Sequence, residues 1–244
     1  MRSAFLVLFL LVLGPCASAF EARIVHVSDG DTVILDNGNR VRLVGINAPE
    51  MASEARDADP YAVQARDELK TMVLNHSVHV VLGPEPRDRY GRTLASLYLE
   101  SGVDVQRAML ERGLAVAVAV PPNVDHVESY LAAETGARIR GDGLWQDDQP
   151  YLYTWPEEGR GRPGFQIAHL NLAGLRETSS NVYLDTTSRF SVQIPKKRWQ
   201  EFSFQERLRE IGTTRIRARG WVVKRDRKFF MILGHPSMLE ADVR

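Results

Sequence analysis

The sequence is short of cysteine and of net charge. Its single cysteine, Cys16, lies in an N-terminal apolar segment, so the rest of the chain can form no disulfide, no thiolate nucleophile and no cysteine metal site. Stability must therefore come from the core alone. The 31 Lys and Arg residues balance the 31 Asp and Glu residues. The net charge therefore gives no sign of a nucleic-acid partner, and any basic surface must be local.

The N-terminal apolar segment is short. Arg2 is followed by an apolar run over residues 4–13 and then by Gly14-Pro15-Cys16-Ala17-Ser18-Ala19. This order is typical of a secretory signal with an Ala-x-Ala cleavage site, and the run is about half of the roughly 20 residues that a membrane span needs. We predict a signal peptide over residues 1–19, cleaved after about Ala19, and a secreted or periplasmic protein with no membrane partner after cleavage. An uncleaved anchor, or a lipoprotein signal at Cys16, is the alternative.

The 244 residues, with 44% apolar and 25% charged side chains, suit a globular chain of one large domain or two small ones. Strand and helix patterns run over residues 20–148, and a stretch rich in Pro, Gly and charge at 149–164 indicates a linker. Strand patterns resume over residues 165–244. We predict a mainly β fold with some α: an OB-type β-barrel with flanking helices, followed by a second, smaller OB-like barrel.

Hydrophobic spacing predicts the individual elements. In the first domain we expect strands at 22–27, 33–35, 41–44, 78–82 and 93–99, and helices at 61–74, 105–112 and 128–139. A hairpin is expected at Asn37-Gly38, because Asn-Gly readily supplies positive φ. In the second domain we expect strands at 166–175, 181–184, 190–194, 214–223 and 229–233, with a helix at 200–211. Five strands with a helix between the third and the fourth favour an OB-like fold.

Several oxygen ligands lie close together in the 22 residues DGDTVILDNGNRVRLVGINAPE. Calcium prefers carboxylate, amide and carbonyl oxygens. Asp31 in the first turn, Asn47 after the next strand and the backbone carbonyl of Ala48 offer one oxygen of each kind. Glu50 would then lie beside the ion and deprotonate or orient a bound water.

Two arginines complete this set: Arg42, and Arg92 in the segment DRYGR. Each can donate forked hydrogen bonds to phosphate oxygens, and these bonds strengthen as charge develops in a transition state. The alternative is an ordinary turn followed by solvent-facing arginines. The order of the full set favours hydrolysis of a phosphodiester over that alternative.

Residues 22–146 resemble the staphylococcal nuclease (thermonuclease) family. The matching segments are DGDTV, VRLVGINAPE, DRYGR, ERGLA and GLW. The family is an OB-fold barrel with extra helices, and its type member is a secreted, calcium-dependent phosphodiesterase that acts on DNA and RNA and leaves 3′-phosphate ends. The resemblance implies that Asp31 is a calcium ligand, that Arg42 and Arg92 are phosphate-binding catalytic arginines, and that Glu50 is the general base. It places Arg89 and Tyr90 where the family contacts a terminal phosphate.

The sequence departs from the family pattern at two places. Asn47 stands where the family has an aspartate, which keeps an oxygen ligand but removes a negative charge from the metal site. The segment GLAVAVAVPP at 113–122 lacks the tyrosines with which the family packs against the nucleotide. Substrate preference therefore does not follow from the resemblance.

The second domain carries a basic run. Strand alternation places Arg215, Arg217 and Arg219 on one face, and the segment from 189 to 228 holds far more basic than acidic residues. We predict that this arginine face, with Trp199 or Trp221 for stacking, binds single-stranded nucleic acid. The alternative is a solvated sheet face with ordinary hairpin lysines.

Taken together, these patterns predict an exported, calcium-dependent endonuclease acting on DNA, RNA or both, with single strands as the expected substrate. Asp31, Asn47 and Ala48 would hold the metal, and Arg42, Glu50 and Arg92 would perform catalysis. One alternative is a catalytically weakened nucleic-acid-binding protein of the same fold. The other is an interaction protein whose second domain docks a partner at the cell envelope.

Overall fold

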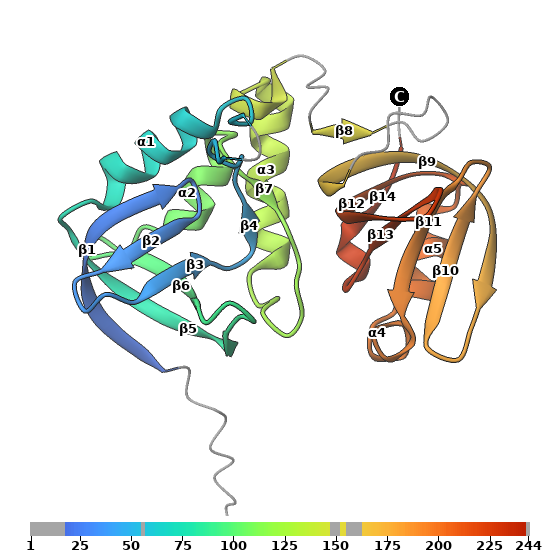
Figure 1. Ribbon diagram of the computed structural model, residues 1–244, viewed down its shortest axis with the longest axis horizontal. Helices are drawn as coiled ribbons and strands as arrows, with labels where there is room; N and C mark the ends of the chain where they lie inside the picture. The colour runs from blue at the N-terminus through green and yellow to red at the C-terminus, as the bar shows by residue number, and fades with distance from the viewer. Residues whose placement is uncertain (1–17, 55–56, 147–151, 155–162, 243–244) are drawn as a thin grey trace, which may run out of the picture.

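The computed structural model describes residues 18–54, 57–146, 152–154 and 163–242, and these form two β-barrels side by side (Figure 1). The predicted signal peptide lies almost entirely outside the described residues, and so does most of the predicted linker at 149–164. Within that linker, Tyr153–Thr154 forms a short strand, β8, which pairs in parallel with β9 of the second barrel. No helix within the described ranges is long and apolar enough to span a membrane.

The first barrel closes in the strand order β1-β2-β3-β6-β5. Its strands are β1 (Ala19–Asp29), β2 (Thr32–Leu35), β3 (Arg40–Leu43), β5 (Ser77–Arg87) and β6 (Thr93–Leu99). The pairing of β3 with β6 is parallel, and the other pairings are antiparallel. A two-stranded sheet of β4 (Ile46–Asn47) and β7 (Val116–Ala117) lies beside the barrel.

The second barrel has the same connectivity. Its strands are β9 (Gly164–Glu177), β10 (Asn181–Thr186), β11 (Phe190–Pro195), β12 (Arg215–Arg225) and β13 (Lys228–Ile232), and β12 pairs back onto β9 to close the ring. The third and fifth strands are again parallel neighbours. Strand β14 (Leu239–Ala241) extends the sheet beyond β12. Both predicted barrels are confirmed, and each has the strand order first, second, third, fifth, fourth.

Helices α1 (Ala62–Val73), α2 (Val105–Glu111) and α3 (Val127–Arg140) agree with the three predicted in the first domain, and α3 leads into the short 3-10 helix η1 (Gly143–Trp145). The helix predicted at 200–211 is wrong in its start and its continuity. The chain instead forms α4 (Lys196–Glu201) and α5 (Phe204–Ile211), because Phe202 between them is extended. The break lets the buried rings of Trp199 and Phe204 stack 5.7 Å apart inside the barrel. A second 3-10 helix, η3 (Pro236–Met238), precedes β14.

The two barrels are docked against each other through α3, which lies between them in Figure 1. Ala119 belongs to the apolar core of the second barrel, and Leu131 of α3 packs against that core. A further apolar cluster joins Val116 and Leu144 of the first domain to Ile167 of β9. The first domain therefore contributes directly to the packing of the second, and the chain is not a pair of freely tethered modules.

Candidate active site

Asp31 lies at the tip of the hairpin that joins β1 to β2, and this tip is tightly packed. A Cβ atom on the preceding Gly30 would lie 2.6 Å from Cβ of Ala48 and 2.7 Å from Cβ of Ala65 in α1. Only glycine lets the turn, the helix and the segment after β4 approach so closely. As a result, the Ala48 backbone N–H donates to Oδ2 of Asp31 over 2.7 Å.

The Asp31 side chain is buried, and it has several polar partners. Besides the Ala48 amide, it accepts a 3.1 Å hydrogen bond from the Thr32 hydroxyl, and it pairs with Arg42 at 3.0 Å. Burial raises the pKa of the Asp31 carboxyl to about 7, and neighbouring Asp29 adds to this, although Arg42 and the Ala48 amide oppose it. The charged carboxylate is therefore poorly compensated, and this favours the approach of a cation.

Arg42 joins two of the predicted metal ligands. One of its terminal nitrogens lies 3.0 Å from Oδ2 of Asp31 and 3.3 Å from Oδ1 of Asn47, while the other donates to the Leu43 carbonyl over 2.8 Å. The Asn47 amide nitrogen in turn lies 3.4 Å from the Ala48 carbonyl oxygen. The structure thus brings the Asp31 and Asn47 oxygens to the same guanidinium nitrogen, whereas the Ala48 carbonyl lies next to the Asn47 amide nitrogen.

The donor set fits a hard cation such as calcium, because it consists of a carboxylate, an amide oxygen and a carbonyl oxygen. Among the described residues, no group of three or more His, Cys, Asp or Glu side chains gathers to hold a metal. The predicted donor set has only one such side chain, Asp31, because the other two donors are an asparagine and a backbone carbonyl. Calcium takes 6–8 oxygen ligands, so water and substrate phosphate would have to supply the rest. With one formal negative charge, the set should bind the ion more weakly than a set with two.

Glu50 follows these donors at once, and its side chain is exposed. Its backbone is fixed by Asp59, whose carboxylate accepts from the Glu50 N–H over 3.1 Å and whose own N–H donates to the Glu50 carbonyl over 2.9 Å. An exposed carboxylate on a fixed backbone suits a base that meets substrate water. We did not single out Asp59 from the sequence. The only sequence signal for it is its position just before Pro60 and the helix that follows.

Arg92 lies immediately before β6, which pairs with β3 so that Leu94 is the register partner of Arg42. In the part of the chain that the structure describes, the Arg92 side chain bonds Asp88 at 2.7 Å and lies near the ring of Tyr90, rather than contacting Arg42 or Glu50. Arg89 also rests on the Tyr90 ring, which is 69% exposed. The structure therefore groups Arg89, Tyr90 and Arg92 in one turn, where both arginines contact the Tyr90 ring.

The chain is similar in sequence to several known proteins. Residues 40–147 match the family described as staphylococcal nuclease homologue. An uncharacterized endonuclease of Escherichia coli O157:H7 is 35% identical over 148 residues, covering 59% of this chain and 90% of that protein. The chain therefore belongs to the staphylococcal nuclease family. The thermonuclease of Staphylococcus hyicus is 29% identical over 128 residues, covering 51% of this chain and 75% of that protein. A third relative, an uncharacterized endonuclease of Haemophilus influenzae, is 33% identical over 150 residues, or 59% of this chain and 78% of that protein.

Membership confirms the resemblance seen in the sequence and identifies the chain as a nuclease that hydrolyses phosphodiester bonds. The matched residues include Asn47, Ala48, Glu50, the turn at 88–92 and the helices α1 to α3, whereas Asp31 lies before the matched range. The second barrel lies outside the matched residues, so its contribution to the nuclease must be judged from its own contacts.

The predicted arginine face of the second barrel needs a correction. Arg215, Arg217 and Arg219 do lie on one side of β12, but only Arg215 is exposed, and Arg219 faces the nuclease domain. Arg219 is only 1% exposed, and it bonds both carboxylate oxygens of Glu134 in α3 at 2.7 Å. Arg217 pairs with Glu240 at 2.7 Å. Arg219 therefore holds the barrels together and cannot touch nucleic acid in this arrangement.

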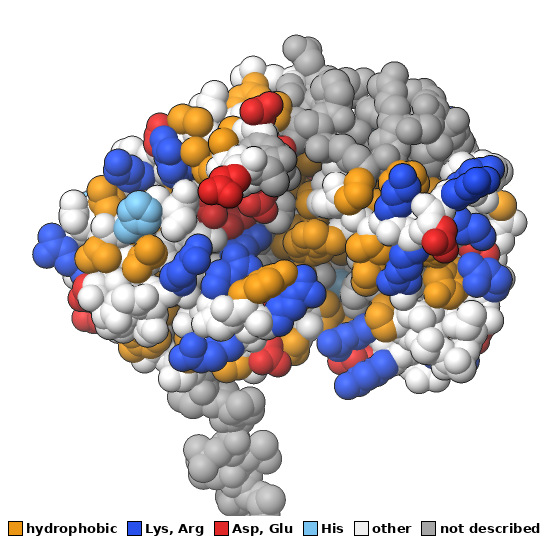
Figure 2. All heavy atoms as spheres, in the orientation of Figure 1, with side chains coloured by type: hydrophobic (Ala, Val, Ile, Leu, Met, Phe, Trp, Pro, Cys, Tyr) orange, Lys and Arg blue, Asp and Glu red, His pale blue; other side chains and the backbone are white. Residues whose placement is uncertain are grey.

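Other basic side chains of the second barrel are open to solvent. An open cavity of about 360 Å³ is lined by Arg189 and Lys228 together with the rings of Tyr183 and Phe230. Of the two tryptophans proposed for stacking, Trp199 is buried in the core, whereas Trp221 is 40% exposed. Figure 2 shows Lys and Arg side chains over both halves of the face in view, with hydrophobic side chains between them.

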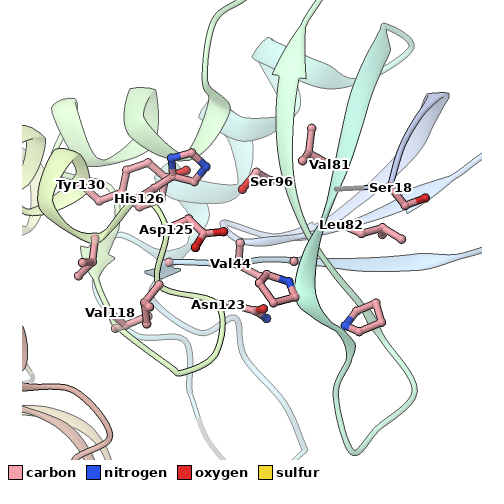
Figure 3. Close-up of a pocket in the computed structure, with 16 residues that line it drawn as sticks. Ser18, Val44, Val81, Leu82, Ser96, Val118, Asn123, Asp125, His126 and Tyr130 are labelled. Atoms are coloured by element: carbon pink, nitrogen blue, oxygen red, sulfur yellow. The ribbon is translucent and has the colours of Figure 1, made fainter. Parts of the chain in front are cut away.

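Another cavity of the nuclease domain lies away from these residues. It has a volume of about 490 Å³ and lies between the barrel and the start of α3, lined by Val44, Leu82, Asn123 and His126 among others (Figure 3). None of the predicted metal or catalytic residues lines it. The chemistry is therefore expected at the smaller, polar cavity beside Glu50.

Proposed function

We propose that this nuclease is an exported, calcium-dependent enzyme that cleaves single-stranded DNA or RNA within the strand. The observation that carries the proposal is the position of Arg42, whose guanidinium contacts both Asp31 and Asn47. Exposed Glu50 lies three residues after Asn47. Asp31, Asn47 and the Ala48 carbonyl would hold calcium, which supplies positive charge for a phosphate oxygen when bound.

The protein residues then have separable tasks. Glu50 takes a proton from the attacking water, whose oxygen forms a bond to phosphorus while the bond to the leaving oxygen breaks. Arg42 donates to the phosphate oxygens as negative charge builds on them. Arg92 would join it after exchanging its bond to Asp88 for one to phosphate, and Arg89 and Tyr90 would hold a neighbouring phosphate.

The export part of the proposal rests on the sequence of residues 1–19. The second barrel would add grip on the substrate through its exposed basic side chains, which include Arg189 and Lys228. Binding through such phosphate contacts weakens steeply as salt rises.

The test uses residues 20–244 on single-stranded DNA and on RNA, in millimolar calcium or in chelator. Glu50→Gln keeps the size of the side chain and removes the base, and Glu100→Gln, an exposed glutamate after β6, is the matched control. Calcium-dependent cleavage that Glu50→Gln reduces by about 10²-fold or more, and that Glu100→Gln leaves intact, supports the proposal. Salt-sensitive binding without cleavage in any divalent metal would instead show a catalytically weakened binding protein.

A further inference from the structure

A cavity of about 220 Å³ lies where the two barrels meet, directly beside the proposed base. Its nuclease wall includes Asn47, Glu50 and Asp59, and its opposite wall includes Gly164, Phe165 and Trp221 of the second barrel. This volume is below the roughly 300–1,000 Å³ that enclose a whole drug-sized ligand. It suits a single planar ring whose attached chain continues outside.

The second-barrel wall of this cavity carries an aromatic pair. Phe165 on β9 and Trp221 on β12 are direct register partners, and their ring centres lie 5.3 Å apart in an edge-to-face arrangement. Phe165 packs against the apolar cluster between the barrels, whereas Trp221 is 40% exposed. One ring is thus anchored, and the other presents open surface beside Glu50.

The nuclease domain's own segment at 116–119 cannot provide such a surface. Its four side chains are alanine or valine and are all buried. The Ala119 N–H points to the sulfur of Met238 at 3.3 Å, so the second barrel covers this segment. Small residues here let the second barrel approach, and the same approach brings Trp221 to the cavity.

We propose that Trp221, supported by Phe165, stacks on the base of the nucleotide next to the phosphate being cleaved. This inference rests on the proposed nuclease site at Glu50. A base can stack on a side chain only when adjacent bases of the nucleic acid do not cover the face of that base. The subsite therefore selects single-stranded substrate. Since every base has a π face, the subsite tolerates all base types.

The test compares Trp221→Leu, which keeps apolar volume without a ring, with Trp221→Phe, which keeps a ring. Ile232→Ala is the matched control, because Ile232 is the cross-strand partner of Trp221, is 37% exposed and is absent from the cavity wall. Steady-state cleavage is measured on a single-stranded oligonucleotide and on the same strand with abasic residues. We expect Trp221→Leu to raise KM on the intact strand about fivefold or more, the low end for one stacked base. Trp221→Phe and Ile232→Ala should stay within about twofold, and the abasic strand should not distinguish the variants.

Equal KM for Trp221→Leu and Ile232→Ala on the intact strand would overturn the subsite. A separate binding measurement keeps this result distinct from failure of the proposed activity. Fluorescence anisotropy of the labelled strand is recorded in the Glu50→Gln background, where cleavage is not required. Weaker binding of Trp221→Leu supports the subsite even if no cleavage is found, and unchanged binding refutes it.

Discussion

Replacing Arg219 by methionine tests whether the two barrels form one rigid enzyme. Arg219 and Glu134 are each only 1% exposed, so solvent cannot readily replace a lost partner. Breaking a buried ion pair costs about 3–5 kcal/mol, because one charge is left buried without compensation. In Arg219→Met, Glu134 keeps a 2.7 Å bond from the Ala117 N–H and the 3.7 Å approach of Arg138, so we expect the lower end, about 3 kcal/mol.

This loss of stability should be measurable by thermal unfolding and by urea unfolding. For a chain of this size, about 1 kcal/mol corresponds to about 2–4 °C, so Arg219→Met should unfold about 6–12 °C below the parent. Arg176→Met is the control, because Arg176 forms a similar fork to Asp185 with side chains that are 49% and 32% exposed. An exposed pair contributes about 0–1 kcal/mol. The double variant Arg219→Met with Glu134→Leu should recover part of the loss, since Glu134 is then no longer buried without its partner and Glu240 keeps Arg217 and Arg138.

A loss below about 1 kcal/mol in Arg219→Met, equal to that of the control, would refute the reasoning. It would show that the Arg219–Glu134 pair is open to water and that the barrels are not docked through α3 as described. The cavity between Glu50 and Trp221 would then lose its structural basis as well.

Three further changes probe the nuclease site. Asn47→Asp adds a second carboxylate to the donor set and should tighten calcium binding about tenfold or more by calorimetry; an unchanged affinity would exclude position 47 as a ligand. Gly30→Ala places a methyl group 2.6 Å from Cβ of Ala48 and should lower the free energy of unfolding by about 1–3 kcal/mol, and an unaltered urea midpoint would contradict the close approach. Because burial raises the folded-state pKa of Asp31 from 3.8 to about 7, the native state binds this proton more tightly than the unfolded state does. In chelator, the parent should therefore lose stability relative to Asp31→Asn as pH rises from about 4 to about 7, and parallel pH profiles of the two proteins would rule this out.

Local patterns were enough to predict most of the elements and the proximity of several candidate site residues. Alternation and turn signals located the ten barrel strands, because strand faces and Asn-Gly turns depend on neighbouring residues. The same holds for Asp31, Arg42, Asn47 and Ala48, which lie on adjacent strands and turns of one hairpin series. Their separation in sequence is short, so their meeting in space follows from strand pairing alone.

Sequence could not decide what the second barrel's arginines face. The alternation correctly put Arg215, Arg217 and Arg219 on one side, but a basic row facing solvent and one facing carboxylates have the same pattern. Docking against α3 decided the matter, because Glu134 and Glu240 come from segments 85 and 21 residues away from Arg219. Whether a charged side chain is buried depends on which surface packs against it, and that is decided only in the folded chain.

By itself, then, the sequence determined two barrels, and it predicted a hard-cation donor set and two phosphate-binding arginines, since each is encoded within a few strands. Only the tertiary structure decided that Asp59 holds the backbone of Glu50, that Trp221 rather than Trp199 is exposed, and that Trp221 and Glu50 line the same cavity. These last relations join residues far apart in the chain. They arise from packing between domains, which no local spacing reports.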